Sequence, residues 1–473
     1  MYINGEWTIS SRQFKVFNPA TGDELGAVAD GGREQAEAAI RVAGAALPEW
    51  SAATAYQRSE LLYRAYRLML EQQPQLAELM TREQGKPLKA ALNEVRYAAD
   101  FLLWFAEEAK RVYGETIPSA RSDQRFLVHR QPVGVVAAIT PWNYPISMLT
   151  RKLAPALAAG CTVVLKPAES TPLCAVAVFR ILEEAGFPPG VANLVTAADP
   201  EPIGIEFCTN PVVKKLTFTG STAVGRRLAR EAAARLKRIS MELGGHAPFI
   251  VFDDADPVHA ARGVSLVKFL NTGQACISPN RIYVHRAILA PFLDTLGERI
   301  GRMRAGNGLD SANAIGPLIN QAAIDKVDRQ VRNAVDSGAT LHCGGRRLTG
   351  EGLDRGFFYA PTLLSDITPD MLIYREETFG PVAPVIAFDD GDDVIAMAND
   401  TQYGLAAYVY TRDLSRAMRA FEGLQFGIVG INDINPTSAA APFGGTGESG
   451  LGREGARQGL EEYLETRLGG FSI

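Results

Sequence analysis

What the 473-residue sequence lacks excludes several classes of protein. Its 48 Lys and Arg residues are outnumbered by 53 Asp and Glu residues, so there is no positive excess to neutralise a nucleic-acid backbone. Its five cysteines are scattered and form no Cys-x-x-Cys pair, which is the spacing expected of a zinc site or a redox disulfide. We therefore expect no nucleic-acid partner, no bound metal and reduced thiols.

Long apolar runs are also missing. The longest uncharged stretch, 131–150, contains Pro141, Asn143 and Pro145, which would interrupt a membrane-spanning helix. The sequence does not open with a basic segment followed by an apolar one, the pattern of a secretion signal. We expect no membrane association and a cytoplasmic location.

The periodicity of apolar residues predicts an α/β protein. Turn residues divide the first thirty positions into short hairpins, and helical spacing runs from Arg33 to about Arg111. Beyond Val128, apolar strands alternate with helices, which predicts a parallel sheet of the dinucleotide-binding type. The strands are GVVAAIT, CTVVLKP, ANLVTA, KKLTFTG and RISMELG. A second alternation, from PFIVFD to about Gly430, predicts a second α/β domain.

Two strand-like segments, RFLVHRQPVGV and YLETRLGGFSI, do not follow this alternation. Unpaired strand edges usually need a partner. We interpret these segments as arms that pair within a homo-oligomer.

Polar residues and glycines follow four of the predicted strands, at 140–143, 166–169, 219–221 and 242–245. Ligands of α/β sheets bind outside the carboxyl ends of strands, so these positions predict a site.

Each of these candidates also has a plain structural interpretation. The segment 220–225 suits a pyrophosphate at a helix N-terminus, or is a simple strand-to-helix turn. Lys166 and Glu169 suit the hydroxyls of a ribose, or lie in a solvated loop. Cys276, in a polar loop, is a candidate nucleophile or a small core residue. Glu242 is a candidate general base or a surface ion pair.

Seven motifs together resemble the aldehyde dehydrogenase superfamily over essentially the whole chain. They are PWNYP (141–145), LKPAEST (165–171), FTGSTAVG (218–225), MELGG (241–245), NTGQAC (271–276), EETFGP (376–381), and PFGG with SGLGRE (442–454). The resemblance implies two open α/β domains, Rossmann-like and catalytic, and a β oligomerisation arm. It assigns 1–113 and 133–243 to NAD(P) binding, 244–444 to catalysis, and 114–132 and 445–473 to oligomerisation or bridging.

The resemblance also implies roles for individual residues. Cys276 becomes the nucleophile, Glu242 the base for the deacylating water, and Asn143 an oxyanion donor, while Lys152 and Glu454 relay protons. The positions that match cofactor contacts are Thr140, Trp142, Lys166, Glu169, Gly220, Ser221, Gly244, Glu377 and Phe379. Because Glu169 would repel a 2′-phosphate, we predict NAD+ while leaving NADP+ open.

Within the superfamily, the chain most resembles the succinate-semialdehyde dehydrogenases. Arg151 matches a carboxylate-binding arginine, although a structural ion pair explains it equally well, and Tyr144 and Thr437 are further candidates for substrate contact. Leu270 stands where a second arginine is usual, and such a loss weakens carboxylate binding by about 1.5–3 kcal/mol. Gly447 likewise replaces a usual lysine.

The aldehyde therefore stays open at this point. The candidates are succinate, glutarate and 2-oxoglutarate semialdehydes, a sulfonated or phosphonated aldehyde, and an uncharged one. A CoA-acylating or phosphorylating enzyme and a non-catalytic scaffold are alternatives, which Glu242 and Cys276 argue against. The resemblance implies a homodimer or homotetramer.

Overall fold

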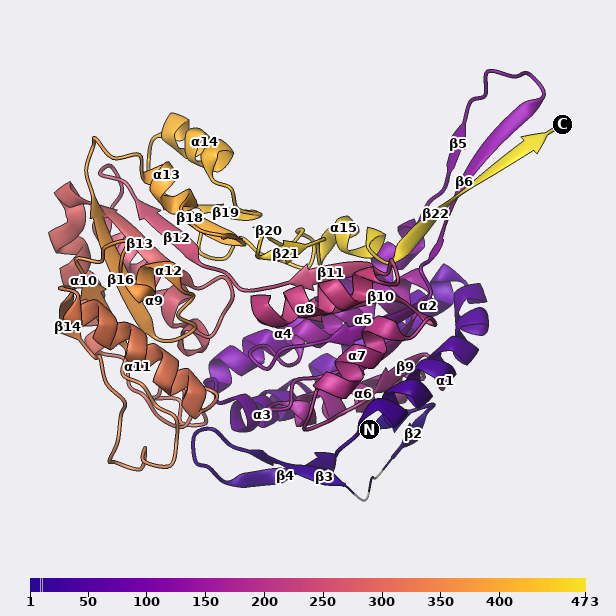
Figure 1. Cartoon of the computed structure of the whole chain (residues 1–473), viewed down its shortest axis with the longest axis horizontal. Helices are drawn as coiled ribbons and strands as arrows, with labels where there is room; N and C mark the ends of the chain where they lie inside the picture. Colours follow the sequence, from indigo (N-terminus) through magenta and orange to yellow (C-terminus); the bar gives the residue numbers. More distant parts are fainter. Residues whose placement is uncertain (9, 11) are drawn as a thin grey trace.

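The computed structural model describes residues 1–8, 10 and 12–473 (Figure 1). Its first large sheet has the strand order β2-β1-β9-β8-β7-β10-β11-β21, of which β9 to β11 are parallel. The bounds are β1 Tyr2–Ile3, β2 Glu6–Trp7, β7 Val135–Ile139, β8 Thr162–Lys166, β9 Ala192–Leu194, β10 Val213–Thr219, β11 Arg238–Glu242 and β21 Gly450–Leu451. The predicted dinucleotide-type sheet is thus confirmed.

Helices cover both faces of this sheet. One face of β7 and β8 packs against α5 and α6, which α2, α3 and α4 cover from outside, and the other packs against α1, α7 and α8. The bounds are α1 Arg33–Ala52, α2 Ala55–Glu71, α3 Gln73–Gln84, α4 Leu88–Glu108, η1 Ala109–Arg111, α5 Ser147–Ala159, α6 Pro172–Ala185, α7 Glu201–Thr209 and α8 Thr222–Ala233. Burial on both faces explains why these strands read as continuous apolar runs.

The second sheet has the order β14-β15-β16-β13-β12-β18-β19, parallel except at β14. Helices α9 and α10 pack on one face, and α11 and α14 on the other. The strands are β12 Ala247–Val251, β13 Pro279–His285, β14 Thr340–Cys343, β15 Thr362–Ser365, β16 Val382–Phe388, β18 Ala406–Tyr410 and β19 Ile428–Ile431. The helices are α9 Pro257–Phe269, η2 Leu270–Gly273, η3 Arg286–Ile288, α10 Leu289–Gly301, α11 Gln321–Asp336, α12 Leu372–Arg375, α13 Val394–Asn399 and α14 Leu414–Gly423.

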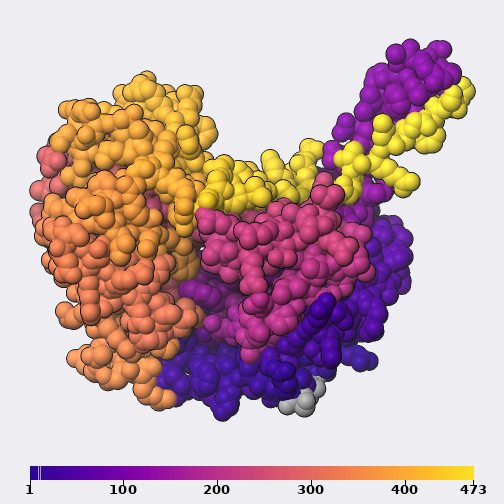
Figure 2. Space-filling view, in the orientation of Figure 1, coloured from indigo at the N-terminus to yellow at the C-terminus, as the bar shows by residue number. Residues whose placement is uncertain are grey.

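The two segments interpreted as arms pair with each other. β22 (Leu464–Ser472) runs antiparallel to β6 (Gln124–Pro132), and β5 (Glu115–Ile117) completes a three-stranded sheet. The first partner of each arm thus lies in the same chain, and pairing within a homo-oligomer stays a prediction. Figure 2 shows this sheet standing clear of the body, with a concave surface between it and the second domain.

Shorter elements complete the chain. β3 and β4 form a hairpin, β17 pairs with β20, and the segment that holds β21 and α15 crosses the first sheet before reaching the arm. The bounds are β3 Gln13–Phe17, β4 Glu24–Ala29, β17 Tyr403–Gly404, β20 Thr446–Gly447 and α15 Ala456–Glu461.

The two sheets present opposite ends to each other. Thr140 and Glu242 lie at the carboxyl ends of β7 and β11, whereas Gly245 and Cys276 come shortly before β12 and β13 begin. The site therefore lies between the carboxyl edge of the first sheet and the amino edge of the second.

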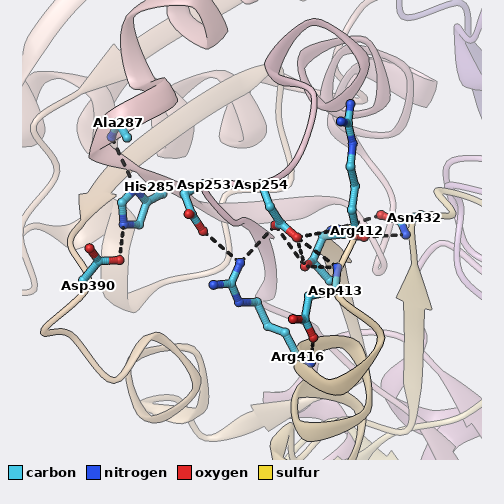
Figure 3. Close-up of polar contacts among 10 residues, drawn as sticks. Asp253, Asp254, His285, Ala287, Asp390, Arg412, Asp413, Arg416 and Asn432 are labelled. Carbon is cyan, nitrogen blue, oxygen red and sulfur yellow. Dashed lines mark hydrogen bonds and ion pairs between the residues drawn. The ribbon is translucent and has the colours of Figure 1, made fainter.

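The carboxyl ends of the second sheet's strands point away from the site and are held by a network of hydrogen bonds and ion pairs (Figure 3). Asp254, just after β12, accepts hydrogen bonds from the Thr411 hydroxyl (2.9 Å) and from the backbone N–H groups of Arg412 (2.8 Å) and Asp413 (2.9 Å). It also pairs with Arg416 at 3.0 Å. These contacts join the ends of β12 and β18 to the start of α14.

Candidate active site

The loop before Cys276 has unusual backbone geometry. Asn271 and Thr272 adopt left-handed conformations, with φ of 50° and 59°, and Gly273 follows with φ of 76°. Non-glycine residues seldom adopt this region, and such strain concentrates at functional sites. Hydrogen bonds hold the loop in place, including one of 3.1 Å from the Thr272 hydroxyl to the Gly316 carbonyl.

Two glycines explain why the motifs around Cys276 need that residue type. A Cβ atom on Gly245 would lie 2.3 Å from the Cys276 carbonyl oxygen, and one on Gly273 would lie 2.1 Å from the Gly380 carbonyl oxygen. The MELGG, NTGQAC and EETFGP motifs therefore meet at backbone contacts that no larger residue permits. Glu377 fixes Gly245 by accepting its N–H at 2.9 Å.

Asn143 lies beside this loop. Its side-chain amide donates to the Gln274 carbonyl at 3.0 Å, two residues before the thiol. Its own backbone carbonyl accepts from the Asn271 amide at 2.9 Å and from the Lys86 ammonium at 2.8 Å. Both the side chain and the peptide of Asn143 are thus held.

A cavity of about 680 Å³ brings together residues that are far apart in the sequence. Of the predicted site residues, it is lined by Trp142, Asn143, Gly220, Ser221, Gly244, Cys276, Glu377 and Phe379. Met148 and Lys326 also line it, and we did not predict either. Lys326 lies on α11 outside every motif, so no local signal in the sequence could have placed it here.

Burial dominates the electrostatics of Cys276 and Glu242. Desolvation raises the pKa of the Cys276 thiol to about 12, although the charge of Arg151 opposes the shift. Desolvation, followed by the charge of Glu454, also raises the pKa of Glu242 well above its usual range. Glu242 is close enough for its charge to act on the thiol. Its Oε2 has no hydrogen-bond partner among residues 1–8, 10 and 12–473.

Behind Glu242 lies a buried charge cluster. Lys152 donates to Glu454 and, at 3.0 Å, to the Thr217 hydroxyl. Arg151 Nε lies 3.0 Å from Glu454 Oε2, an ion pair without hydrogen-bond geometry. Burial would raise the pKa of Glu454, but the two cations outweigh it and hold that pKa below its usual range.

The predicted cofactor residues fit a dinucleotide. The hydroxyls of Thr140 and Thr219, at the ends of β7 and β10, are buried and have no hydrogen-bond partner within the described chain. Ser221 caps the N-terminus of α8, accepting from Val224 at 3.4 Å, as the plain structural interpretation of that turn held. A helix N-terminus beside unsatisfied hydroxyls suits a pyrophosphate and its sugars.

Lys166 and Glu169 form an ion pair with each other. The lysine side chain is 3% exposed, whereas the glutamate side chain is 37% exposed. The carboxylate that we expected to repel a 2′-phosphate is thus partly neutralised.

The predicted substrate residues are more dispersed. Arg151 is buried against Glu454, and its guanidinium lies 3.9 Å from the centre of the Phe443 ring. This is the ion pair that the sequence left as an alternative. Leu270 is 43% exposed, and Thr437 lies near Asn435, with 3.4 Å between their side-chain oxygens.

Comparison with known proteins identifies the class. Residues 7–468 match the model of the aldehyde dehydrogenase family, so the chain belongs to that family and is an NAD(P)-dependent oxidoreductase. The fold agrees. A solved structure titled as an Escherichia coli NADP-dependent enzyme superposes with a TM-score of 0.97 at 49% identity, covering 100% of this chain and 98% of the other.

Two relatives that are named for semialdehyde substrates are also similar to this chain. A probable NADP+-dependent succinate-semialdehyde dehydrogenase of Sinorhizobium fredii is 53% identical over 96% of this chain and 92% of its own length. A glutarate-semialdehyde dehydrogenase of Pseudomonas putida is 49% identical over 98% of this chain and 96% of its own length.

Two features are absent from residues 1–8, 10 and 12–473. No helix there is long and apolar enough to cross a bilayer. No group of three or more His, Cys, Asp or Glu side chains there is placed to hold a metal ion.

Proposed function

We propose that the chain oxidises a short semialdehyde to its carboxylate with NAD(P)+, through a thioester on Cys276. The observation that supports this most is the cavity in which Cys276 and Asn143 lie together, with Glu242 close enough to act on the thiol. In this proposal Cys276, Glu242 and Asn143 are catalytic residues, while Lys152 and Glu454 pass protons.

The first step is attack of the Cys276 sulfur on the aldehyde carbon. Because burial raises the pKa of the thiol, a base must accept its proton, and Glu242 and Glu377 are the carboxylates whose charges act on it. The Asn143 amide and the Cys276 backbone N–H hold the developing oxyanion. When bound, the nicotinamide supplies the acceptor for the hydride that leaves this carbon.

The second step is hydrolysis of the thioester. Glu242 takes a proton from a water molecule that attacks the thioester carbonyl, and the carboxylate leaves as the C–S bond breaks. The Glu454–Lys152 pair behind Glu242 offers that proton a way out.

The semialdehyde assignment is supported by the relatives and by one nitrogen atom. Nη2 of Arg151 is buried and has no hydrogen-bond partner within the described residues, so it is left to bind an anionic group. Leu270 removes a second cation, which favours a substrate held by one arginine and apolar contacts. Glutarate semialdehyde and a sulfonated aldehyde are the next candidates.

We also propose use of both NAD+ and NADP+. The Lys166–Glu169 pair contains a cation that offsets the carboxylate, and the Sinorhizobium relative is named for NADP+. The domain boundaries that the family resemblance assigns are likewise a proposal.

A homo-oligomer is proposed on the apolar residues of the arm. Leu468 and Phe471 are 62% and 50% exposed, an arrangement typical of a surface that another subunit covers. A cytoplasmic location stays a prediction.

The decisive experiment is a panel of aldehydes assayed without phosphate or CoA. We expect the highest kcat/KM with a dicarboxylic semialdehyde, and reduced nicotinamide that forms continuously. Formation only after CoA or phosphate is added would refute hydrolysis. Arg151→Ala should penalise succinate semialdehyde more than hexanal; equal losses would remove Arg151 from substrate recognition.

A further inference from the structure

A buried ion pair from the N-terminal helical lobe reaches the loop that carries Asn143. Lys86 lies between α3 and α4, and Glu94 lies on α4. Each side chain is only 1% exposed, and the two are paired directly. The catalytic steps proposed above assign no role to this pair.

Both members of the pair contact the same short loop. The Lys86 ammonium donates to the Asn143 backbone carbonyl at 2.8 Å and lies 4.1 Å from the centre of the Tyr144 ring. The Glu94 carboxylate accepts from the backbone N–H groups of Ile146 at 3.0 Å and Ser147 at 3.2 Å. The pair therefore holds the loop at its beginning and at its end.

Glu94 also supplies what α5 lacks. That helix begins at Ser147, and its N-cap, Ile146, has no side-chain acceptor for the free N–H groups of the first turn. A carboxylate from α4 takes this place and complements the helix dipole. The same helix carries Arg151 and Lys152, so its position sets that of the charge cluster behind Glu242.

Stability alone is a weak reason for such a pair. Removing two charges from water costs several kcal/mol per ion, and apolar residues of similar volume often serve a fold as well or better. Here the ammonium donates a hydrogen bond to the peptide carbonyl of Asn143, a residue that lines the same cavity as Cys276. This hydrogen bond indicates that the pair serves to fix the position of the Asn143 peptide.

We infer that Lys86 is a positioning residue for catalysis: its ammonium, held by Glu94, fixes the Asn143 peptide so that the amide of that side chain meets the oxyanion. This inference rests on the proposed role of Asn143. A shift of about 1 Å at such a group costs up to roughly 100-fold in rate.

The test uses a double variant, Lys86→Met/Glu94→Gln, in the full-length enzyme. It removes both charges together, so no unpaired ion is left in the interior. The Glu94→Gln change keeps a side-chain oxygen for the N–H groups of Ile146 and Ser147, so the end of the loop stays held while the contacts of the Lys86 ammonium with Asn143 and Tyr144 are lost. Arg58→Met is the matched control, because buried Arg58 donates to the Ala158 carbonyl at the other end of α5.

We expect the double variant to lose roughly 10- to 100-fold in kcat for succinate semialdehyde with NADP+. KM and the dissociation constant for NADP+ should stay within about twofold, since Lys86 contacts neither ligand in this proposal. Arg58→Met should keep its kcat within about twofold, at a thermal midpoint matched to that of the double variant. A merely structural role would lower both kcat values alike.

A double-mutant cycle with Asn143→Ala separates the possible outcomes. If Lys86 acts through Asn143, adding the Lys86→Met/Glu94→Gln changes to Asn143→Ala should have no further effect on kcat. An equal loss in that background, an unchanged kcat in the double variant, or an equal loss in Arg58→Met would each overturn the inference while leaving the proposed function intact. If Asn143→Ala itself keeps its kcat, the oxyanion assignment fails first.

Discussion

The two sheets of this molecule contribute opposite ends of their strands to one site. In the first sheet, the carboxyl ends of β7, β10 and β11 carry the predicted cofactor residues and the base. In the second sheet, the amino ends of β12 and β13 carry the glycine contact and the nucleophile, and the carboxyl ends carry the Asp254 network (Figure 3).

The difference lies in how each edge satisfies its polar groups. At the first sheet's edge, the hydroxyls of Thr140 and Thr219 have no partner in the described chain, as expected of groups awaiting a ligand. At the far edge of the second sheet, Asp254 accepts from three neighbours and pairs with Arg416. In this molecule, the carboxyl edge that faces the site is the one whose hydroxyls are left for a ligand.

The largest expected effect tests the site that lies between the two sheets. Cys276→Ala should lower kcat by about 10⁴-fold or more, because no other group can form the thioester. Binding of NADP+, followed by fluorescence titration, should be unchanged. Cys343→Ala, at a partly exposed thiol on β14, is the matched control and should keep full activity.

The next effect separates the two chemical steps. Glu242→Gln should lower steady-state turnover by about 10³-fold, because the water that cleaves the thioester loses its base. Acylation should suffer less, because the Glu377 carboxylate, whose charge also acts on the thiol, is left to take the thiol proton. Rapid mixing would then show one burst of reduced nicotinamide, and mass spectrometry an acylated enzyme. A variant that turns over at the wild-type rate would remove Glu242 from this role.

A pH experiment tests a buried carboxyl group that contacts a helix packed on the first sheet. Burial raises the pKa of Glu83 to about 7, and its carboxyl group accepts from the Cys174 backbone at 2.9 Å, at the start of α6. The folded state therefore favours the neutral form. This stabilisation is complete below about pH 4.5 and is lost as the pH rises through about 7.

The shift corresponds to about 3 kcal/mol. Thermal midpoints measured from pH 5 to 8 should fall for the wild type and less for Glu83→Gln. Parallel curves would contradict the assignment.

The smallest expected effect comes from the far edge and has the opposite sign. Although burial acts to raise it, the pKa of Asp254 lies below its usual range because of hydrogen bonds from Thr411, Arg412 and Asp413 and the charge of Arg416. Its contribution is present above the unfolded pKa and is lost as the pH falls. Asp254→Asn should cost about 1–3 kcal/mol in unfolding free energy with kcat unchanged. A tenfold loss of kcat with an unchanged unfolding free energy would contradict this prediction, because the Asp254 edge would then serve catalysis rather than stability.

The local part of this structure could be predicted from sequence. Apolar runs predicted β7, β8, β10, β11 and β12, because most residues of each strand are buried. Motifs predicted eight of the residues that line the cavity. Contacts between distant segments were missed: Glu83 and Glu94 each hold the start of a helix that follows a strand of the first sheet, and Lys326 reaches the cavity from α11. The helical periodicity of a sequence does not show which distant residue a buried glutamate will contact.

The arm has a consequence for biosynthesis. Ser472 hydrogen-bonds Asp123, 349 residues earlier in the chain, and the whole of β22 pairs with β6. During translation, β6 has only the short β5 beside it, so one edge of this sheet stays open until β22 emerges. The assembly of subunits through this arm, which we propose above, therefore has to wait until β22 has been made.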